Sequence, residues 1–109
     1  MQTGVLSLVR GDDQEIGITV NNSDGTPYNL SGASLILTAR DSEYFSDIIF
    51  RSSGSSHIAP ESGISEIVLS SEVTSSGGNK KYYFDVKLLD AGNKITTLMA
   101  GDLLFYPRP

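Results

Sequence analysis

Apolar and polar side chains alternate most clearly near the C-terminal end of the chain. The even-numbered residues from Tyr82 to Leu88 are aromatic or aliphatic, and Tyr83, Asp85 and Lys87 lie between them. A period of two places alternate side chains on opposite faces of a β-strand. The pattern therefore predicts a strand whose even-numbered side chains face a core and whose odd-numbered side chains face outward.

The residues after this strand predict a hairpin. Residues 90–93 (Asp-Ala-Gly-Asn) have turn chemistry, and Gly92 can adopt a positive φ without steric cost. A second β-rich run over residues 95–100 is expected to return alongside the first strand. Gly101 is expected to interrupt this run as a bulge or corner, before a further extended run over residues 103–106.

Shorter apolar runs between turn residues predict the other strands, at residues 5–10, 16–20, 33–40, 48–50 and 64–69. The run at 33–40 has apolar side chains on both faces, which predicts a central strand or a strand covered by another chain. The Ser/Gly-rich residues 52–56 are expected to form a loop, and Ser71 to cap a single helical turn. Turn signals recur about every 8–12 residues. We therefore predict an all-β fold, a single small antiparallel β-sandwich over residues 1–109, immunoglobulin-like or jelly-roll-like, with about eight strands.

Composition narrows the range of functions. The 109 residues include no cysteine and one histidine, which argues against disulfides, a structural zinc site and, more generally, a bound cofactor. The net charge is −5, and the eight basic residues are scattered, so neither nucleic acid nor an anionic membrane surface is an expected partner. The first residues lack the charged and apolar regions of a signal peptide, and no apolar run is long enough to span a membrane.

Three groups of residues could carry chemistry, and each has a simpler interpretation. Residues 10–12 (Arg-Gly-Asp) resemble an integrin-binding tripeptide, but a turn is the favoured interpretation. Two acidic clusters lack the spacing of a calcium loop and are interpreted as solvated loop charges; they are Asp12, Asp13, Glu15 and Asp41, Glu43, Asp47. His57 lies among serines without a nucleophile-elbow motif, and we interpret it as an exposed, inert loop residue. No enzymatic activity is expected.

Tyrosines are the remaining candidates for a binding surface. Exposed tyrosines are common at protein interfaces and on carbohydrate-binding surfaces, because an apolar ring with a polar tip tolerates burial against a partner. The best candidates are Tyr83, on the outward face of its strand, and Tyr44 and Phe45, which follow each other in a predicted loop. The alternative, left open here, is that these rings pack under neighbouring loops.

Several segments match a known kind of module in the same order. They are Asp24-Gly25-Thr26-Pro27 with Leu30-Ser31-Gly32-Ala33, then Lys81-Tyr82-Tyr83-Phe84-Asp85-Val86, and then Thr96-Thr97-Leu98 with Gly101. This order, which covers residues 10–107, resembles the small β-sandwich module of tailed-phage baseplate and tail-fibre proteins. It looks most like the N-terminal domain of upper baseplate proteins from phages of Gram-positive bacteria. The resemblance implies a structural adaptor that is attached to longer fibre or host-binding segments.

The resemblance implies a non-enzymatic phage structural or accessory protein. Because no fibre segment follows Pro109, we expect a standalone tail accessory or a protein that works through partner subunits, located in the virion or, after synthesis, in the host cytoplasm. Sheet faces or an edge strand would bind tail, baseplate or receptor-binding components, or a second copy, through Tyr83, Asp85, Lys87, Tyr44 and Phe45. Two alternatives are a carbohydrate-binding module for host cell-wall polymer and an early-expressed intracellular phage protein that binds a host factor.

Overall fold

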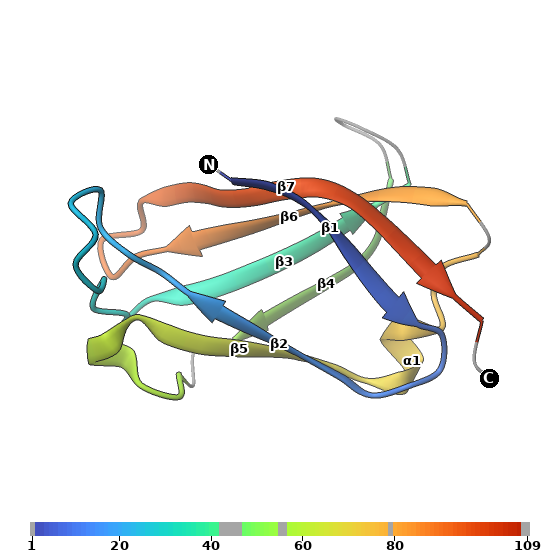
Figure 1. Cartoon of the computed structure of the whole chain (residues 1–109), viewed down its shortest axis with the longest axis horizontal. Coiled ribbons are helices and arrows are strands. Elements are labelled where there is room, and N and C mark those ends of the chain that lie inside the picture. Colours follow the sequence, from blue (N-terminus) through green and yellow to red (C-terminus); the bar gives the residue numbers. More distant parts are fainter. Residues whose placement is uncertain (1, 42–46, 55–56, 79, 108–109) are drawn as a thin grey trace.

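The computed structural model describes residues 2–41, 47–54, 57–78 and 80–107, and these residues form two β-sheets that face each other (Figure 1). This confirms the all-β sandwich. The strands of the described residues are β1 (Gln2–Val9), β2 (Gln14–Thr19), β3 (Ser34–Arg40), β4 (Ile48–Gly54), β5 (Ile64–Leu69), β6 (Lys81–Leu89) and β7 (Ile95–Tyr106). The short turns η1 (Pro60–Ser62) and α1 (Ser71–Thr74) join them, and no helix of the described residues is long and apolar enough to cross a membrane.

The two sheets differ in width. One has five strands in the order β1-β7-β6-β3-β4, and the other pairs only β2 with β5. Every strand pair is antiparallel except β1 with β7, which is parallel. The antiparallel prediction is therefore wrong for this pair. After β1 the chain crosses through residues 10–13 to the opposite sheet. Because no hairpin joins β1 to a strand of its own sheet, β1 can lie beside β7 and run in the same direction.

The β6–β7 hairpin forms as predicted, but β7 is one continuous strand through Gly101. The irregularity in the pairing lies elsewhere, between Val86 and Lys87, where Leu98 has no partner across the ladder. Gly101 instead allows β1 to approach, because a Cβ atom there would lie 1.8 Å from the carbonyl oxygen of Gly4. Treating Gly101 as a break divided one strand into two, which explains why eight strands were predicted and seven are described.

Three local predictions need correction. Gly92 does not adopt the positive φ of its turn; Asn93 does (φ 65°), which short polar side chains tolerate. The N-cap of α1 is Ser70, whose hydroxyl accepts a hydrogen bond from the Val73 amide at 3.4 Å, and not Ser71. Residues 52–54, which were predicted to be part of a loop, belong to β4. Their pairing with β3 requires only backbone groups, so their small side chains do not prevent it.

The core lies between the sheets and contains the predicted face of β6. Tyr82, Phe84, Val86 and Leu88 are all buried there, and the Tyr82 ring meets the edge of Phe105 with centroids 5.4 Å apart. β3 lies between β6 and β4, as its two partly apolar faces predicted. The largest fully buried apolar side chains among the described residues are Leu8, Leu30, Leu35, Leu37, Ile67, Leu69 and Leu103.

Candidate functional site

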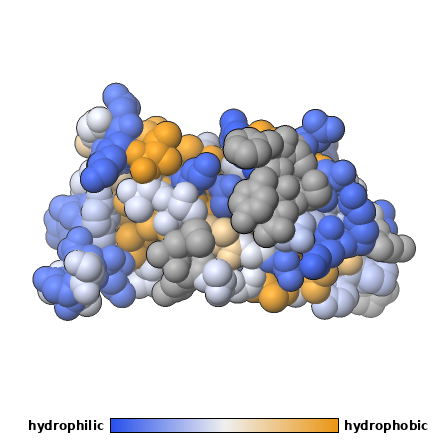
Figure 2. All heavy atoms as spheres, turned by 90° about the horizontal axis from the view of Figure 1, so that it is seen from above, coloured by the Kyte–Doolittle hydropathy of each residue, from blue (hydrophilic) through white to orange (hydrophobic). Residues whose placement is uncertain are grey.

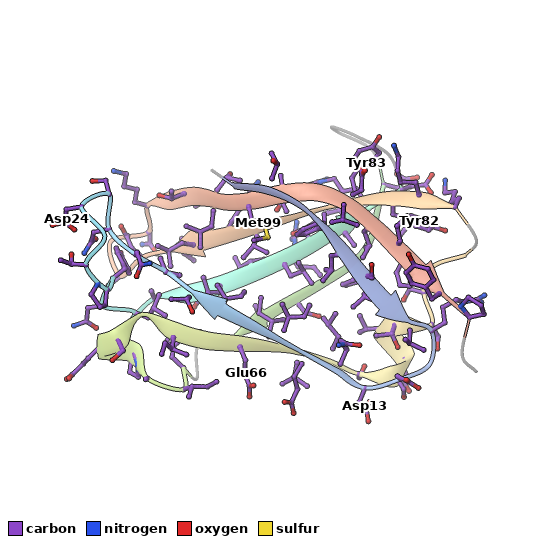
Figure 3. All side chains as sticks on the ribbon, in the orientation of Figure 1. Asp13, Asp24, Glu66, Tyr82, Tyr83 and Met99 are labelled. Carbon is purple, nitrogen blue, oxygen red and sulfur yellow. The ribbon has the colours of Figure 1, made fainter. Side chains whose placement is uncertain are left out.

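The outer face of the five-stranded sheet carries the three outward residues predicted on β6. Tyr83, Asp85 and Lys87 alternate with the buried residues of this strand and are each partly exposed. Figure 3 shows Tyr83 pointing away from the sandwich and Tyr82 lying on its inner side. Because β6 lies between β7 and β3, these side chains stand near the middle of the sheet and not at its rim.

Charged side chains surround Tyr83. Its partners across the ladders are Asp102 on β7 and Arg40 on β3. The Lys81 ammonium lies 5.6 Å from the centre of the Tyr83 ring, within the range of a cation–π contact, and 4.0 Å from an Asp102 carboxylate oxygen. The ring is thus the apolar centre of a mixed-charge surface.

Asp85 already has a partner within the protein. Its Oδ2 atom lies 3.9 Å from Nε of Arg40, with 19% and 24% of the two side chains exposed. Its Oδ1 atom is buried and has no hydrogen-bond partner among the described residues. A partly buried ion pair of this kind is expensive to break. Asp85 therefore positions Arg40 beside Tyr83.

The other two predicted interface residues, Tyr44 and Phe45, lie outside the described residues, so their role stays a prediction. Figure 2 views the molecule from above, the side toward which Tyr83 points in Figure 3. Hydrophilic and hydrophobic atoms are interspersed over the part of this side that the described residues form. A surface of this kind is typical of non-obligate protein interfaces, whose overall polarity resembles that of the remaining surface.

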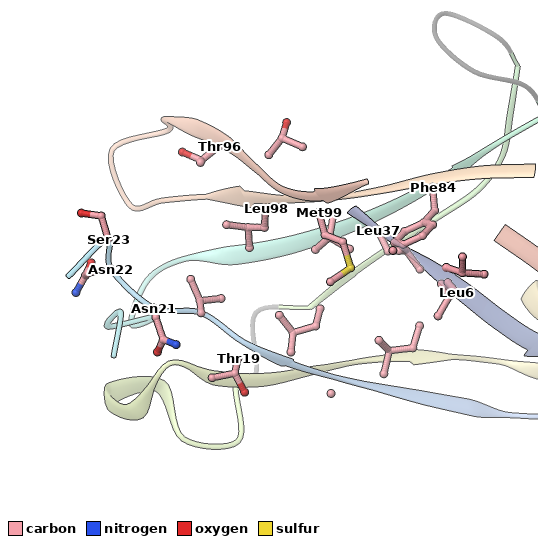
Figure 4. A pocket seen from close by; sticks show the side chains of 18 residues that line it. Leu6, Thr19, Asn21, Asn22, Ser23, Leu37, Phe84, Thr96, Leu98 and Met99 are labelled. Carbon is pink, nitrogen blue, oxygen red and sulfur yellow. The ribbon is translucent and has the colours of Figure 1, made fainter. Parts of the chain in front are cut away.

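A groove between the two sheets is the second candidate site, and the sequence did not indicate it. It has a volume of about 800 Å³ and opens between β1 and β2 (Figure 4). Its walls include the partly buried side chains of Leu6, Ile16, Ile18, Leu98 and Met99. The alternation of Ile16 and Ile18 predicted a strand with one buried face. It did not predict that the opposite sheet would leave part of that face open to a groove.

His57 is not the exposed residue that was expected. Its Nδ1 atom lies 2.7 Å from Oγ of Ser65, and its Nε2 atom donates to the carbonyl oxygen of Ala33 at 2.8 Å. The side chain thereby connects β5 to the start of β3. Ser65 is completely buried, so its hydroxyl is not available to attack a substrate. This Ser–His contact therefore has a structural explanation.

The acidic cluster near residue 12 is used for local structure. The Asp13 carboxylate accepts a hydrogen bond from the Ser71 amide at 2.8 Å, at the start of α1. Gly11, with φ 83°, allows residues 10–12 to form the expected turn. No group of three potential metal ligands comes together among the described residues, and Glu43 of the second cluster lies outside them.

Two charged groups have shifted pKa values. Hydrogen bonds from the hydroxyl and the amide of Thr26 lower the pKa of Asp24, which is fully exposed at the turn before Pro27. A hydrogen bond to Asp41 raises the pKa of Lys80, whose ammonium also lies 5.1 Å from the centre of the Tyr82 ring. Both groups stabilise loops through these contacts, and neither of them lines the groove.

Comparison with known proteins identifies the fold. The chain is similar to the solved "N-terminal domain of phage TP901-1 ORF48", with a TM-score of 0.53, 13% identity, and coverage of 97% of this chain and 86% of that one. The two share a fold. This agrees with the phage sandwich module that the segment order resembles. No protein-family model and no curated protein matches the sequence.

Proposed function

We propose that this chain is a non-enzymatic structural or accessory module of a tailed phage, which associates with tail, baseplate or receptor-binding components. The observation that carries the proposal is the shared fold over 97% of the chain. The neighbour is the N-terminal domain of a phage protein, ORF48 of phage TP901-1. The independent match in the order of turn and strand segments supports the same assignment.

The outer face supplies a physical basis for association. Tyr83 offers an amphipathic ring, and Arg40, Lys81 and Asp102 around it offer charges of both signs. Aromatic rings and arginine are enriched where proteins bind one another, and complementary charges set the orientation of the partner. In this proposal the ring contributes most of the affinity and the surrounding charges contribute specificity.

Mass spectrometry of purified virions tests the proposal most directly. We expect peptides of this chain at a fixed copy number relative to the major tail proteins. Absence from virions, together with its recovery from infected host cells, would contradict a structural role and favour an early-expressed protein that binds a host factor. Saturable binding of purified cell-wall polymer by the monomeric chain would favour the carbohydrate-binding alternative.

Replacing Tyr83 with Ala tests the surface itself. We expect weaker association with the tail component found in the virion, or weaker self-association, with an unchanged circular-dichroism spectrum, because the ring lies outside the core. Tyr106→Ala is the matched control, since Tyr106 is half exposed but lies beyond Leu104, the residue of β7 that pairs with the first residue of β6. Equal sedimentation of the wild type and both variants at every concentration, alone and with the partner, would argue against this face.

A further inference from the structure

The two-stranded sheet is too narrow to cover the five-stranded one. β4 and β5 meet closely, since a Cβ atom on Gly54 would lie 3.2 Å from the carbonyl oxygen of Glu66. On the other side no strand of the described residues lies beyond β2, and the groove separates β2 from β1 and β7 (Figures 1 and 4). One strand position beside β2 is therefore vacant.

The backbone of β2 faces this vacancy with unused hydrogen-bonding groups. The Val20 amide donates to Gly63, across the ladder to β5, at 2.8 Å. In a strand, backbone groups point alternately to the two sides. The amides and carbonyls of Glu15, Gly17 and Thr19 therefore point to the free edge, where no hydrogen bond is made to them within the described part of the chain. Glu15, Gly17 and Thr19 are all exposed, and the exposed surface of Gly17 is backbone, so the edge is accessible.

The side chains beside this edge are apolar and incompletely covered. Ile16 and Ile18 point inward from β2, opposite Leu6, Leu98 and Met99, and all five are only partly buried. None of the described residues that line the groove is charged, although 19% of the chain is. A charged side chain would lose its hydration here without gaining a partner, so the groove selects an uncharged occupant.

We propose that the groove and the free edge of β2 bind an extended segment of a partner polypeptide, apolar at alternate residues, as an additional strand. Its backbone would pair with Glu15, Gly17 and Thr19, and its alternate side chains would cover Ile16 and Ile18. This site is separate from the outer face, and it does not depend on the proposed role in a phage tail.

The free edge and the groove together favour a polypeptide strand over other occupants. A lipid or another small apolar molecule would fill the groove but leave the backbone groups of the edge unpaired. A second copy of the chain is a poor donor, because its edge strands β1, β4, β2 and β5 already turn their inward side chains toward its own core. These side chains include Leu8, Phe50, Ile18 and Leu69. Only an extended chain with free alternate side chains meets both requirements.

Amide hydrogen exchange measured by NMR tests this on the full chain. The probe is a set of soluble peptides of about eight residues in which Val, Ile, Leu or Phe alternates with Thr. We expect saturable binding by at least one of them, with exchange slowed tenfold or more at the amides of Glu15, Gly17 and Thr19. The amides of Ile16 and Ile18, which already pair with β5, should not change.

Two controls separate backbone pairing from simple apolar contact. The same peptides N-methylated on the residues that would pair keep their side chains but lose the donors, and we expect at least a tenfold loss of affinity. Leu98→Lys places a charge in the groove and should abolish binding, whereas Val68→Lys, on the outer surface of β5, should not. Circular dichroism confirms that each variant is folded.

Three outcomes would overturn the proposal. The first is that no peptide of the set binds at millimolar concentration. The second is binding that N-methylation does not weaken, which would make the site an apolar cleft without strand addition. The third is protection of Gly17 and Thr19 that rises with protein concentration when no peptide is present, which would make a second copy the occupant.

Discussion

The two long sides of the sandwich are built differently. On the side of β4 and β5, the sheets approach until backbone meets backbone, and a side chain on Gly54 would press against Glu66. On the side of β1 and β2, the sheets separate around a groove of about 800 Å³. Inward apolar side chains alternate on β2, with Ile16 and Ile18, as they do on β5, with Ile67 and Leu69. What differs is the number of strands that cover these side chains. A strand of this fold is therefore half buried because a neighbouring strand is missing, and not because its apolar residues alternate less regularly.

Disturbing the contact between β1 and β7 should have one of the two largest effects, because this contact forms one wall of the open side. Gly101→Ala introduces a Cβ atom 1.8 Å from the Gly4 carbonyl oxygen, so β1 must separate from β7. We expect a loss of about 3 kcal/mol in the free energy of unfolding, the upper end of overpacking effects. Urea denaturation followed by circular dichroism measures it.

Gly4→Ala is the matched control for this change, since a Cβ atom on Gly4 has nothing within 4 Å. Its effect should stay within about 0.5 kcal/mol. If the two alanine variants unfolded at the same urea concentration, β1 would not lie against β7 as described.

A pair of isoleucines compares the two sides directly. Ile67 and Ile16 are opposite each other on β5 and β2, but Ile67 is 1% exposed and Ile16 is half buried beside the groove. We expect Ile67→Ala to cost about 2–5 kcal/mol, because it leaves a closed cavity. Ile16→Ala should cost less than about 2 kcal/mol, since water already reaches that side chain. Equal costs in urea denaturation would mean that the groove is closed in solution.

The connection made by His57 should rank next. His57→Ala leaves the buried Ser65 hydroxyl and the Ala33 carbonyl without partners, at an expected cost of about 1–3 kcal/mol. The double variant with Ser65→Ala removes one of these unpaired groups and should therefore cost less than the sum of the two single changes. Strictly additive costs would show that the His57–Ser65 contact contributes nothing.

The smallest effect is expected at the turn near the polar end of the groove. Because hydrogen bonds from Thr26 lower the pKa of Asp24, carboxyl NMR should give a titration midpoint below 3.8. Thr26→Val should raise the midpoint. A lowered pKa means that the ionised form stabilises the turn above the unfolded pKa, and that this contribution is lost as the pH falls through the folded pKa. A midpoint at or above 3.8 in the wild type would contradict the contact.

Alternation predicted the strands well because it is a local property. The buried face of β6, the outward position of Tyr83 and the central position of β3 all follow from side chains two residues apart. The width of each sheet does not follow from such a pattern, because it depends on which strands, distant in sequence, become neighbours. The groove was missed for this reason.

Long-range contacts account for two further errors. The two hydrogen-bond partners of His57 are 8 and 24 residues away, so the serines next to it gave no indication of its role. Gly101 was interpreted from its own strand alone. Its small size is required because the backbone of Gly4, nearly the whole chain away in sequence, lies directly against it. In both cases a residue that looks local is explained by a partner that only the fold brings near.

The parallel pairing of β1 and β7 has a mechanical consequence. The first strand begins at one end of this ladder and the last strand finishes at the other, so the chain ends leave in opposite directions (Figure 1). A force that pulls these ends apart would slide the two strands along each other and load all their hydrogen bonds at once. Such an arrangement resists tension far better than a hairpin, which opens one bond at a time.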